Sequence, residues 1–283
     1  MDEKGVDLVI FKKSAMIGEK NGVSYMNGKV SLQGFSMNVY SYLIDGVLID
    51  TGARSLHKYF ESFIDHADFD QVLITHHHED HTGCAAYIEK TKKTPIYINE
   101  KSINICTDKA DYPFYRKAFW GIRMPFHTHP TPTIFQSRNA TWDVIDTPGH
   151  AFDHQSFLNR ETGQLFTGDL FVQVHTKLLL SNESIPTIIQ SLEKVLSFDF
   201  NEVICQHAGF VNDGRIQIQK KLDYLVSIQQ EVMELNKIGY SASEICGKLF
   251  PKKYPIIKLS RGEWDSLHIV NSILNESIIQ NDH

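Results

Sequence analysis

Short apolar runs rich in β-branched residues recur along the chain as far as residue 205. Two of them cover residues 37–44 and 47–50, and the Asp45-Gly46 pair between them predicts a tight hairpin turn. Residues 72–74 form another run, which predicts a buried strand. Further strands are expected at residues 7–11, 28–32, 94–98, 156–159, 164–167 and 203–205.

Longer stretches with helical periodicity alternate with these strands. Residues 55–67 place Leu56, Phe60 and Ile64 on one face, and residues 184–196 show a similar apolar stripe. A chain of 283 residues can form one large α/β domain, or one such domain with a small appendix.

The pattern changes near the C-terminus, where only helical signals remain. Residues 214–238 predict a long helix, residues 241–244 have the sequence of a capping box, and residues 264–279 predict a further helix. We therefore expect a main domain at 1–212 and a helical extension at 213–283.

The loop after residues 72–74 carries the densest set of chemically active side chains. It contains four histidines and an aspartate, and then leads into a predicted helix at 82–89. Imidazole and carboxylate groups bind zinc, manganese and iron(II). Alternate side chains of a loop can point to one place, so His76 and His78 can bind one metal while Asp80 and His81 project toward a second.

Three more candidate ligands each follow a short predicted strand. They are His150 in a Pro-Gly-His turn, Asp169 in a Thr-Gly-Asp sequence and His207 in a Gln-His-Ala-Gly sequence. The whole set, in this order, resembles the metallo-β-lactamase superfamily, and specifically its glyoxalase II-like and lactonase-like hydrolases, over about residues 7–215.

This resemblance implies an αββα sandwich, an α/β fold with two β-sheets between outer helices. It also implies two divalent metal ions, expected to be zinc, with iron or manganese as alternatives. On the family pattern, His76, His78 and His150 hold the first metal, Asp80, His81 and His207 hold the second, and Asp169 bridges the two.

Such a site predicts a metal-dependent hydrolase. One zinc ion lowers the pKa of its bound water to about 7, and two cations would deliver hydroxide to an ester, thioester or lactone. Asp80 is the candidate catalytic residue, as a proton shuttle to the leaving group. Two alternatives stay open: a persulfide dioxygenase with one iron on His76, His150 and Asp169, and a phosphodiesterase or nuclease.

Several polar residues near these positions have two interpretations. Asp50 either forms a simple turn or hydrogen-bonds to a metal ligand and orients it. His77 and Glu79 are expected to point away from the metals. Asp153 and His154 are expected to support the ligands without binding metal.

Residues 100–140 form an insertion rich in aromatic residues and proline, which either walls an apolar substrate pocket or covers the core or a dimer contact. Its His127 and His129 are expected to be ordinary loop histidines. Val172 stands where lactonase-like members carry a tyrosine, and His175 is a candidate replacement as hydrogen-bond donor.

Composition narrows the possible partners. The net charge is −6 without a run of Lys and Arg, which argues against nucleic acid as partner. Uninterrupted apolar segments are too short to span a membrane. We expect a cytoplasmic protein with a small-molecule substrate, in which a homodimer is possible. Scattered cysteines support a reducing compartment: Cys84, Cys106, Cys205 and Cys246.

Overall fold

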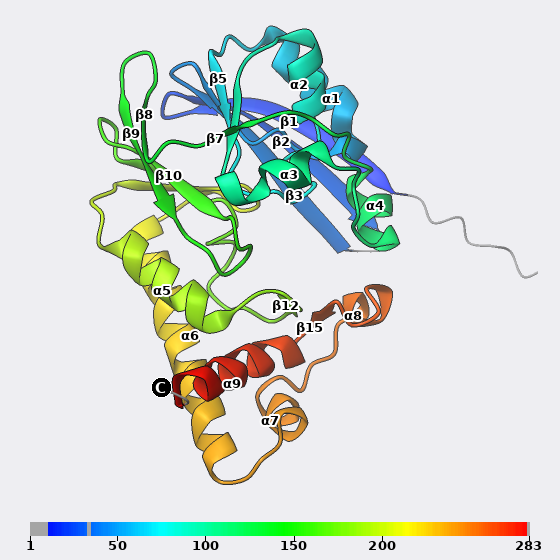
Figure 1. Cartoon of the computed structure of the whole chain (residues 1–283), viewed down its shortest axis with the longest axis vertical. Coiled ribbons are helices and arrows are strands. Elements are labelled where there is room, and N and C mark those ends of the chain that lie inside the picture. Colours follow the sequence, from blue (N-terminus) through cyan, green and yellow to red (C-terminus); the bar gives the residue numbers. More distant parts are fainter. Residues whose placement is uncertain (1–10, 33–34, 282–283) are drawn as a thin grey trace, which may run out of the picture.

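Two mixed β-sheets face each other at the centre of the molecule, and helices cover their outer surfaces (Figure 1). The computed structural model describes residues 11–32 and 35–281. Pairing in the first sheet is antiparallel from β1 to β4 and parallel from β4 to β7. Its strands, in spatial order, are β1 (Lys12–Lys20), β2 (Val23–Leu32), β3 (Phe35–Ile44), β4 (Val47–Ile49), β5 (Gln71–Leu73), β6 (Ile96–Ile98) and β7 (His129–Pro130).

The second sheet is antiparallel except where β11 and β13 pair in parallel. A two-stranded sheet of β12 (Leu179–Leu180) and β15 (Trp264–Asp265) lies apart from both. The spatial order of the second sheet is β14 (Gly209–Val211), β13 (Glu202–Cys205), β11 (Gln164–Phe166), β10 (Gln155–Asn159), β9 (Thr141–Asp146) and β8 (Ile134–Gln136).

Three apolar layers hold this arrangement together. Between the sheets, Tyr42 of β3 packs in one buried cluster with Trp142 and Phe166 of the second sheet. Outside the first sheet, the cluster includes Phe60 and Ile64 of α1. The helices on this side are α1 (His57–His66), which continues the short 3-10 helix η1 (Arg54–Leu56), and α2 (Ala85–Thr91).

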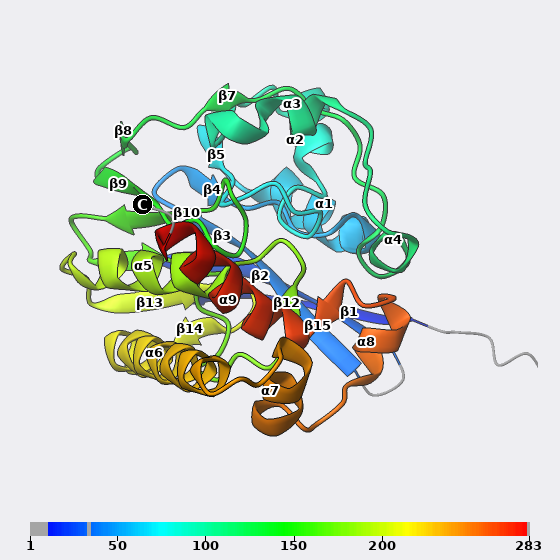
Figure 2. The ribbon, with the colours of Figure 1, turned by 60° about the horizontal axis from the view of Figure 1, so that its bottom comes forward.

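The third apolar layer joins the second sheet to α5 (Ile185–Leu196) and to the C-terminal helices (Figure 2). Leu192 of α5 and Ile273 of α9 belong to this one cluster. A domain boundary near residue 212 stays a prediction. The C-terminal helices are α6 (Gly214–Lys237), α7 (Ala242–Leu249), α8 (Pro255–Leu259) and α9 (Leu267–Asn281).

Several local predictions are confirmed. Asp45 and Gly46 form the turn between β3 and β4 with φ angles of 49° and 76°, values that favour glycine and aspartate. Ser241 and Glu244 form the predicted capping box of α7. The strand expected at 7–11 lies outside the described residues, apart from Phe11.

The last helix was predicted to begin at Trp264, and this is wrong. It begins at Leu267, because Trp264 and Asp265 pair with β12 and the Asp265 carboxylate accepts a hydrogen bond from the Leu267 amide. None of the helices in the described ranges is both long and apolar enough to cross a membrane.

Between residues 100 and 140 the chain forms the short helices η2 (Glu100–Ser102), α3 (Ile103–Thr107) and α4 (Phe114–Trp120), and then β7 and β8. Phe119 and Trp120 of α4 are buried against the outer cluster of the first sheet, whereas Phe114 is 83% exposed. The insertion is therefore anchored at one end of α4.

Candidate metal centre

The histidine-rich loop leaves the end of β5 and is held in place by Asp50. This buried aspartate lies just beyond β4, and its carboxylate accepts hydrogen bonds from the backbone amide and the hydroxyl of Thr75. Its Oδ2 also lies 2.8 Å from His81 Nδ1. The interpretation of Asp50 as a residue that orients a candidate metal ligand is confirmed.

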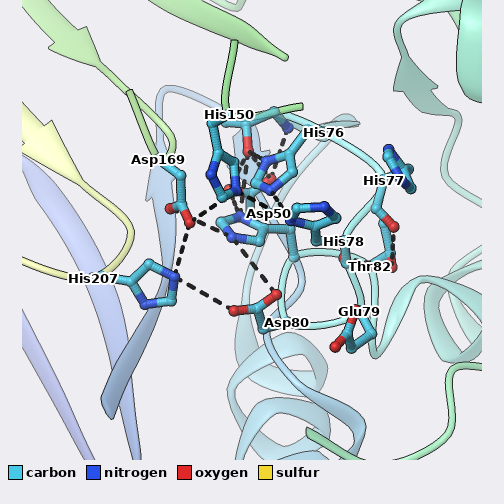
Figure 3. A network of polar contacts seen from close by, with 12 residues as sticks. Asp50, His76, His77, His78, Glu79, Asp80, Thr82, His150, Asp169 and His207 are labelled. Atoms are coloured by element: carbon cyan, nitrogen blue, oxygen red, sulfur yellow. Dashed lines mark hydrogen bonds and ion pairs between the residues drawn. The ribbon is translucent and has the colours of Figure 1, made fainter. Parts of the chain in front are cut away.

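Three imidazole nitrogens meet at the first group of candidate ligands (Figure 3). His76 Nε2 lies 3.0 Å from His78 Nδ1, and His150 Nε2 lies 3.1 Å from the same atom. His76 and His78 come from the loop after β5, and His150 from the turn after β9. The two sheets thus contribute jointly to this group.

A second group consists of Asp80, His81 and His207. His207 Nε2 lies 3.4 Å from Asp80 Oδ2, and His81 Nε2 lies 3.9 Å from Asp80 Oδ1. Like the first group, it combines the loop after β5 with the second sheet, because His207 follows β13.

Asp169 lies between the two groups. Its Oδ2 is 3.4 Å from His150 Nε2 and 3.1 Å from His207 Nε2, while its Oδ1 is 3.5 Å from His81 Nε2. The two oxygens of this carboxylate thus lie near histidines of both groups, an arrangement that suits a bridging ligand.

The histidines of the cluster differ in the direction in which their surroundings shift the pKa. Burial and the neighbouring imidazoles hold the pKa of His76 and of His78 well below the usual range, so both rings are neutral. Burial opposes ionisation of Asp169, but His207 and His81 hold its pKa well below the usual range. Burial opposes protonation of His81, His150 and His207 too, but the carboxylates beside them raise the pKa of all three, so a bound cation would have to displace their protons.

Two atoms of this cluster have no hydrogen-bond partner in the described chain although both are buried. They are His81 Nε2 and Asp169 Oδ1. A buried polar atom without a partner is costly, and a cation would satisfy both atoms at once. Nitrogen and oxygen donors in this arrangement fit divalent ions such as zinc, iron or manganese.

Three further groups fix the orientation of the candidate ligands. Glu183 Oε1 lies 2.6 Å from His150 Nδ1, the Asn38 carbonyl oxygen lies 2.5 Å from His207 Nδ1, and His154 Nε2 accepts a hydrogen bond from the Asp169 amide. Such contacts fix the tautomer and direction of a metal ligand. The supporting role expected for His154 is thereby confirmed.

Sequence reasoning missed Glu183 and Asn38. Glu183 precedes α5 in a Ser-Asn-Glu-Ser stretch that looks like an ordinary helix start, and Asn38 contributes only a backbone carbonyl. No side-chain signal could have indicated the second contact.

The alternate side chains of the loop point away from the cluster, as predicted (Figure 3). His77 Nδ1 lies 2.7 Å from the buried carboxylate of Asp153, which also accepts hydrogen bonds from the His77 amide and the Ser102 hydroxyl. Glu79 forms two hydrogen bonds with the Arg116 guanidinium.

The remaining candidate histidines lie elsewhere. His127 is exposed, with Nδ1 2.7 Å from Glu89, and His129 is exposed on β7. His175 is exposed and its ring packs 4.9 Å from that of Tyr224 on α6. In the described ranges none of the three belongs to a group of potential metal ligands.

Fold and site together define a metallo-hydrolase. The chain belongs to the Metallo-beta-lactamase superfamily, whose sequence pattern matches residues 36–207. The family assignment confirms the resemblance to this superfamily, and the two-sheet fold with C-terminal helices confirms the expected fold class.

Relatives of this chain include proteins named as a metallo-hydrolase and as a thioesterase. A protein of Bacillus subtilis named probable metallo-hydrolase YqjP is 24% identical over 269 residues, which cover 77% of this chain and 82% of that protein. The thioesterase pkgB of Emericella nidulans is 32% identical over 154 residues, 52% of this chain. This chain spans only 38% of the length of pkgB.

Solved structures share the fold at low identity. A beta-lactamase domain protein from Burkholderia ambifaria has a TM-score of 0.64 at 14% identity, covering 94% of this chain and 88% of its own. The metallo-beta-lactamase family protein TTHA1429 from Thermus thermophilus has a TM-score of 0.63 at 18% identity, with 86% and 89% covered. The glyoxalase II-like or lactonase-like branch stays a prediction.

Proposed function

We propose that this metallo-hydrolase cleaves an ester, thioester or lactone at a centre of two divalent cations, with zinc as the expected metal. The observation that carries the proposal is a pair of buried atoms without hydrogen-bond partners, His81 Nε2 and Asp169 Oδ1, inside a converging set of donors. Their ion-pair contact of 3.5 Å leaves both without a hydrogen bond, and a structural scaffold would gain nothing from that.

The proposed assignment of ligands follows the geometry. Asp169 would serve both ions, because its two oxygens face different histidines. His76, His78 and His150 would hold the first ion, and Asp80, His81 and His207 the second.

Bound cations would supply an acidified water and would polarise the carbonyl of the substrate. The side chains of the protein have separate tasks. Glu183 and the Asn38 carbonyl keep the rings of His150 and His207 aimed at the centre. Asp80 borders the second group, and it is the candidate for passing a proton to the leaving group.

Thioesters are the first substrates to try. The relatives named thioesterases include pkgB and the atrochrysone carboxyl ACP thioesterase of Aspergillus fumigatus, which is 24% identical over 73% of this chain and 61% of its own length. The substrate of the present protein is therefore proposed to be a small acyl compound.

The test has two parts. The metal content of protein purified without chelator or added metal should approach two zinc equivalents per chain by elemental mass spectrometry. A panel of ester, thioester and lactone substrates should then show turnover that is lost in Asp169→Asn. One equivalent of iron with oxygen uptake on adding persulfide would instead indicate a dioxygenase. Turnover of bis-p-nitrophenyl phosphate alone would indicate a phosphodiesterase.

A further inference from the structure

Glu79 is a buried carboxylate in an unusual place. It lies between His78 and Asp80, the candidate ligands of the two different ions, and is 2% exposed. Its side chain points away from the cluster (Figure 3). A buried charge of this kind needs a partner that stays in position.

That partner is Arg116 of α4. Arg116 Nε lies 2.7 Å from Glu79 Oε1 and Arg116 Nη2 lies 2.7 Å from Glu79 Oε2, which is the strong two-bond geometry of an arginine–carboxylate pair. The arginine side chain is only 15% exposed. The aromatic insertion is thereby fastened directly to the metal loop.

The same guanidinium reaches a third segment. Arg116 Nη1 lies 3.3 Å from an oxygen of Glu263, in the turn before β15. The Glu263 carbonyl in turn accepts a hydrogen bond from the Ser181 amide, next to β12. We name Glu79, Arg116 and Glu263 the carboxylate clasp. Through the Arg116 guanidinium it joins the metal loop, the insertion and the C-terminal segment.

We propose that Arg116 is a positioning residue, and that the carboxylate clasp makes metal retention depend on the docking of the insertion and the C-terminal segment. The inference rests on the proposed metal centre. Without Arg116, the Glu79 carboxylate would have to turn toward water. His78 and Asp80 are its direct neighbours in the chain, so this movement would displace a candidate ligand of each ion.

The test measures zinc affinity by competition with a chromophoric chelator, in protein first stripped of metal. Arg116→Met should bind zinc about 10–100-fold more weakly than the parent, the usual effect of losing a group that supports metal ligands. The matched control is Arg138→Met, which removes a surface arginine paired in the same two-bond way with Asp70. It should bind zinc like the parent.

A second variant separates positioning from general stability. Glu79→Met/Arg116→Met removes both charges of this pair, leaves no carboxylate at position 79 to turn toward water, and should recover most of the lost zinc affinity. Arg116→Lys keeps the charge without the two parallel bonds and should fall between parent and Arg116→Met. It also replaces Arg116→Met in the comparison if that variant does not fold.

Two results would overturn the clasp as a positioning device. One is parent-like zinc affinity in Arg116→Met with a lower thermal midpoint in chelator, since the clasp would then only stabilise the fold. The other is a double variant that binds zinc no better than Arg116→Met. A parent protein that binds no metal at all would instead refute the proposed function on which the clasp depends.

Discussion

At the scale of single residues, His76 and His78 present different nitrogens to the same point. His76 uses Nε2 and His78 uses Nδ1, and the two atoms are 3.0 Å apart. Nδ1 lies closer to the backbone than Nε2, so two rings that leave the chain two residues apart can converge from different depths. The sequence predicts the convergence, but it does not indicate which nitrogen each ring uses.

Glu183 sets the direction of the His150 ring, and its removal should weaken metal binding. Its Oε1 lies 2.6 Å from His150 Nδ1 and the residue is 7% exposed. Glu183→Gln keeps the shape but loses the charge, so zinc affinity should fall about 10–100-fold in a chelator competition. Glu193→Gln, an exposed substitution on α5, serves as control and should have no effect.

His154 should make the metal-free protein sensitive to acid. Burial, followed by the nearby His150, lowers the pKa of His154 from 6.5 to about 3. The unfolded chain therefore binds a proton here that the folded chain does not, and stability falls as pH decreases through the window between these two values. The contribution of one such proton is about 1.4 kcal/mol per pH unit.

Urea unfolding of chelator-treated protein at several pH values between 6 and 4 tests this expectation. His154→Gln should reduce the pH slope of the free energy of unfolding by about the contribution of one proton. An unchanged slope would show that the ring takes up its proton in the folded protein.

At the scale of elements, the two ends of the short helix α4 differ in exposure. Trp120 is 7% exposed, packs 4.6 Å from the Phe119 ring and has its ring centre 6.3 Å from that of His207, whereas Phe114 is 83% exposed. The insertion thus reaches a candidate metal ligand through an aromatic side chain. Its interpretation as the wall of a substrate pocket stays a prediction.

Truncation should destabilise the protein at one end of α4 and have little effect at the other. Trp120→Ala should lower the free energy of unfolding by about 3–5 kcal/mol, the usual cost of emptying a buried aromatic site. Phe114→Ala should change it by less than about 0.5 kcal/mol, because the ring is in solvent. Urea denaturation with both variants decides this. If the wall interpretation holds, Trp120→Ala should also raise KM for substrates with apolar acyl groups.

The predicted elements were correct where a local sequence signal alone determines the structure. Asp45-Gly46 defined its turn because only a few residues accept positive φ, and Ser241 with Glu244 defined the start of α7 through reciprocal hydrogen bonds. The prediction for Trp264 failed because this residue pairs with Leu180 of β12, which is far away in the chain. Local periodicity carries no information about such a partner.

At the scale of the whole molecule, some residues of the candidate site can be predicted from the sequence and others cannot. The candidate ligands could be named from motif order, because each follows a strand and carries a metal-binding side chain. The side chains that support these ligands could not be named from the sequence. Arg116 lies 37 positions from Glu79 and 147 from Glu263, and only tertiary packing brings these charges together.

The last prediction concerns the two sheets together. The loop after β5 supplies His76, His78, Asp80 and His81, while the turns and loops of the second sheet supply His150, Asp169 and His207. Bound cations would therefore cross-link the two halves of the sandwich. A ligand at 1,000 times its Kd stabilises the folded state by about 4 kcal/mol.

For a chain of 283 residues that stabilisation corresponds to a rise of about 5–9 °C in the thermal midpoint. Differential scanning calorimetry of zinc-loaded and chelator-treated protein should show a shift in this range. Asp169→Asn should remove most of it, because this residue faces both groups of ligands. Lys194→Gln on the outer surface of α5 should keep the full shift, since its side chain only contacts the Asp146 carbonyl. An equal shift in Asp169→Asn and Lys194→Gln would mean that zinc binds outside this centre.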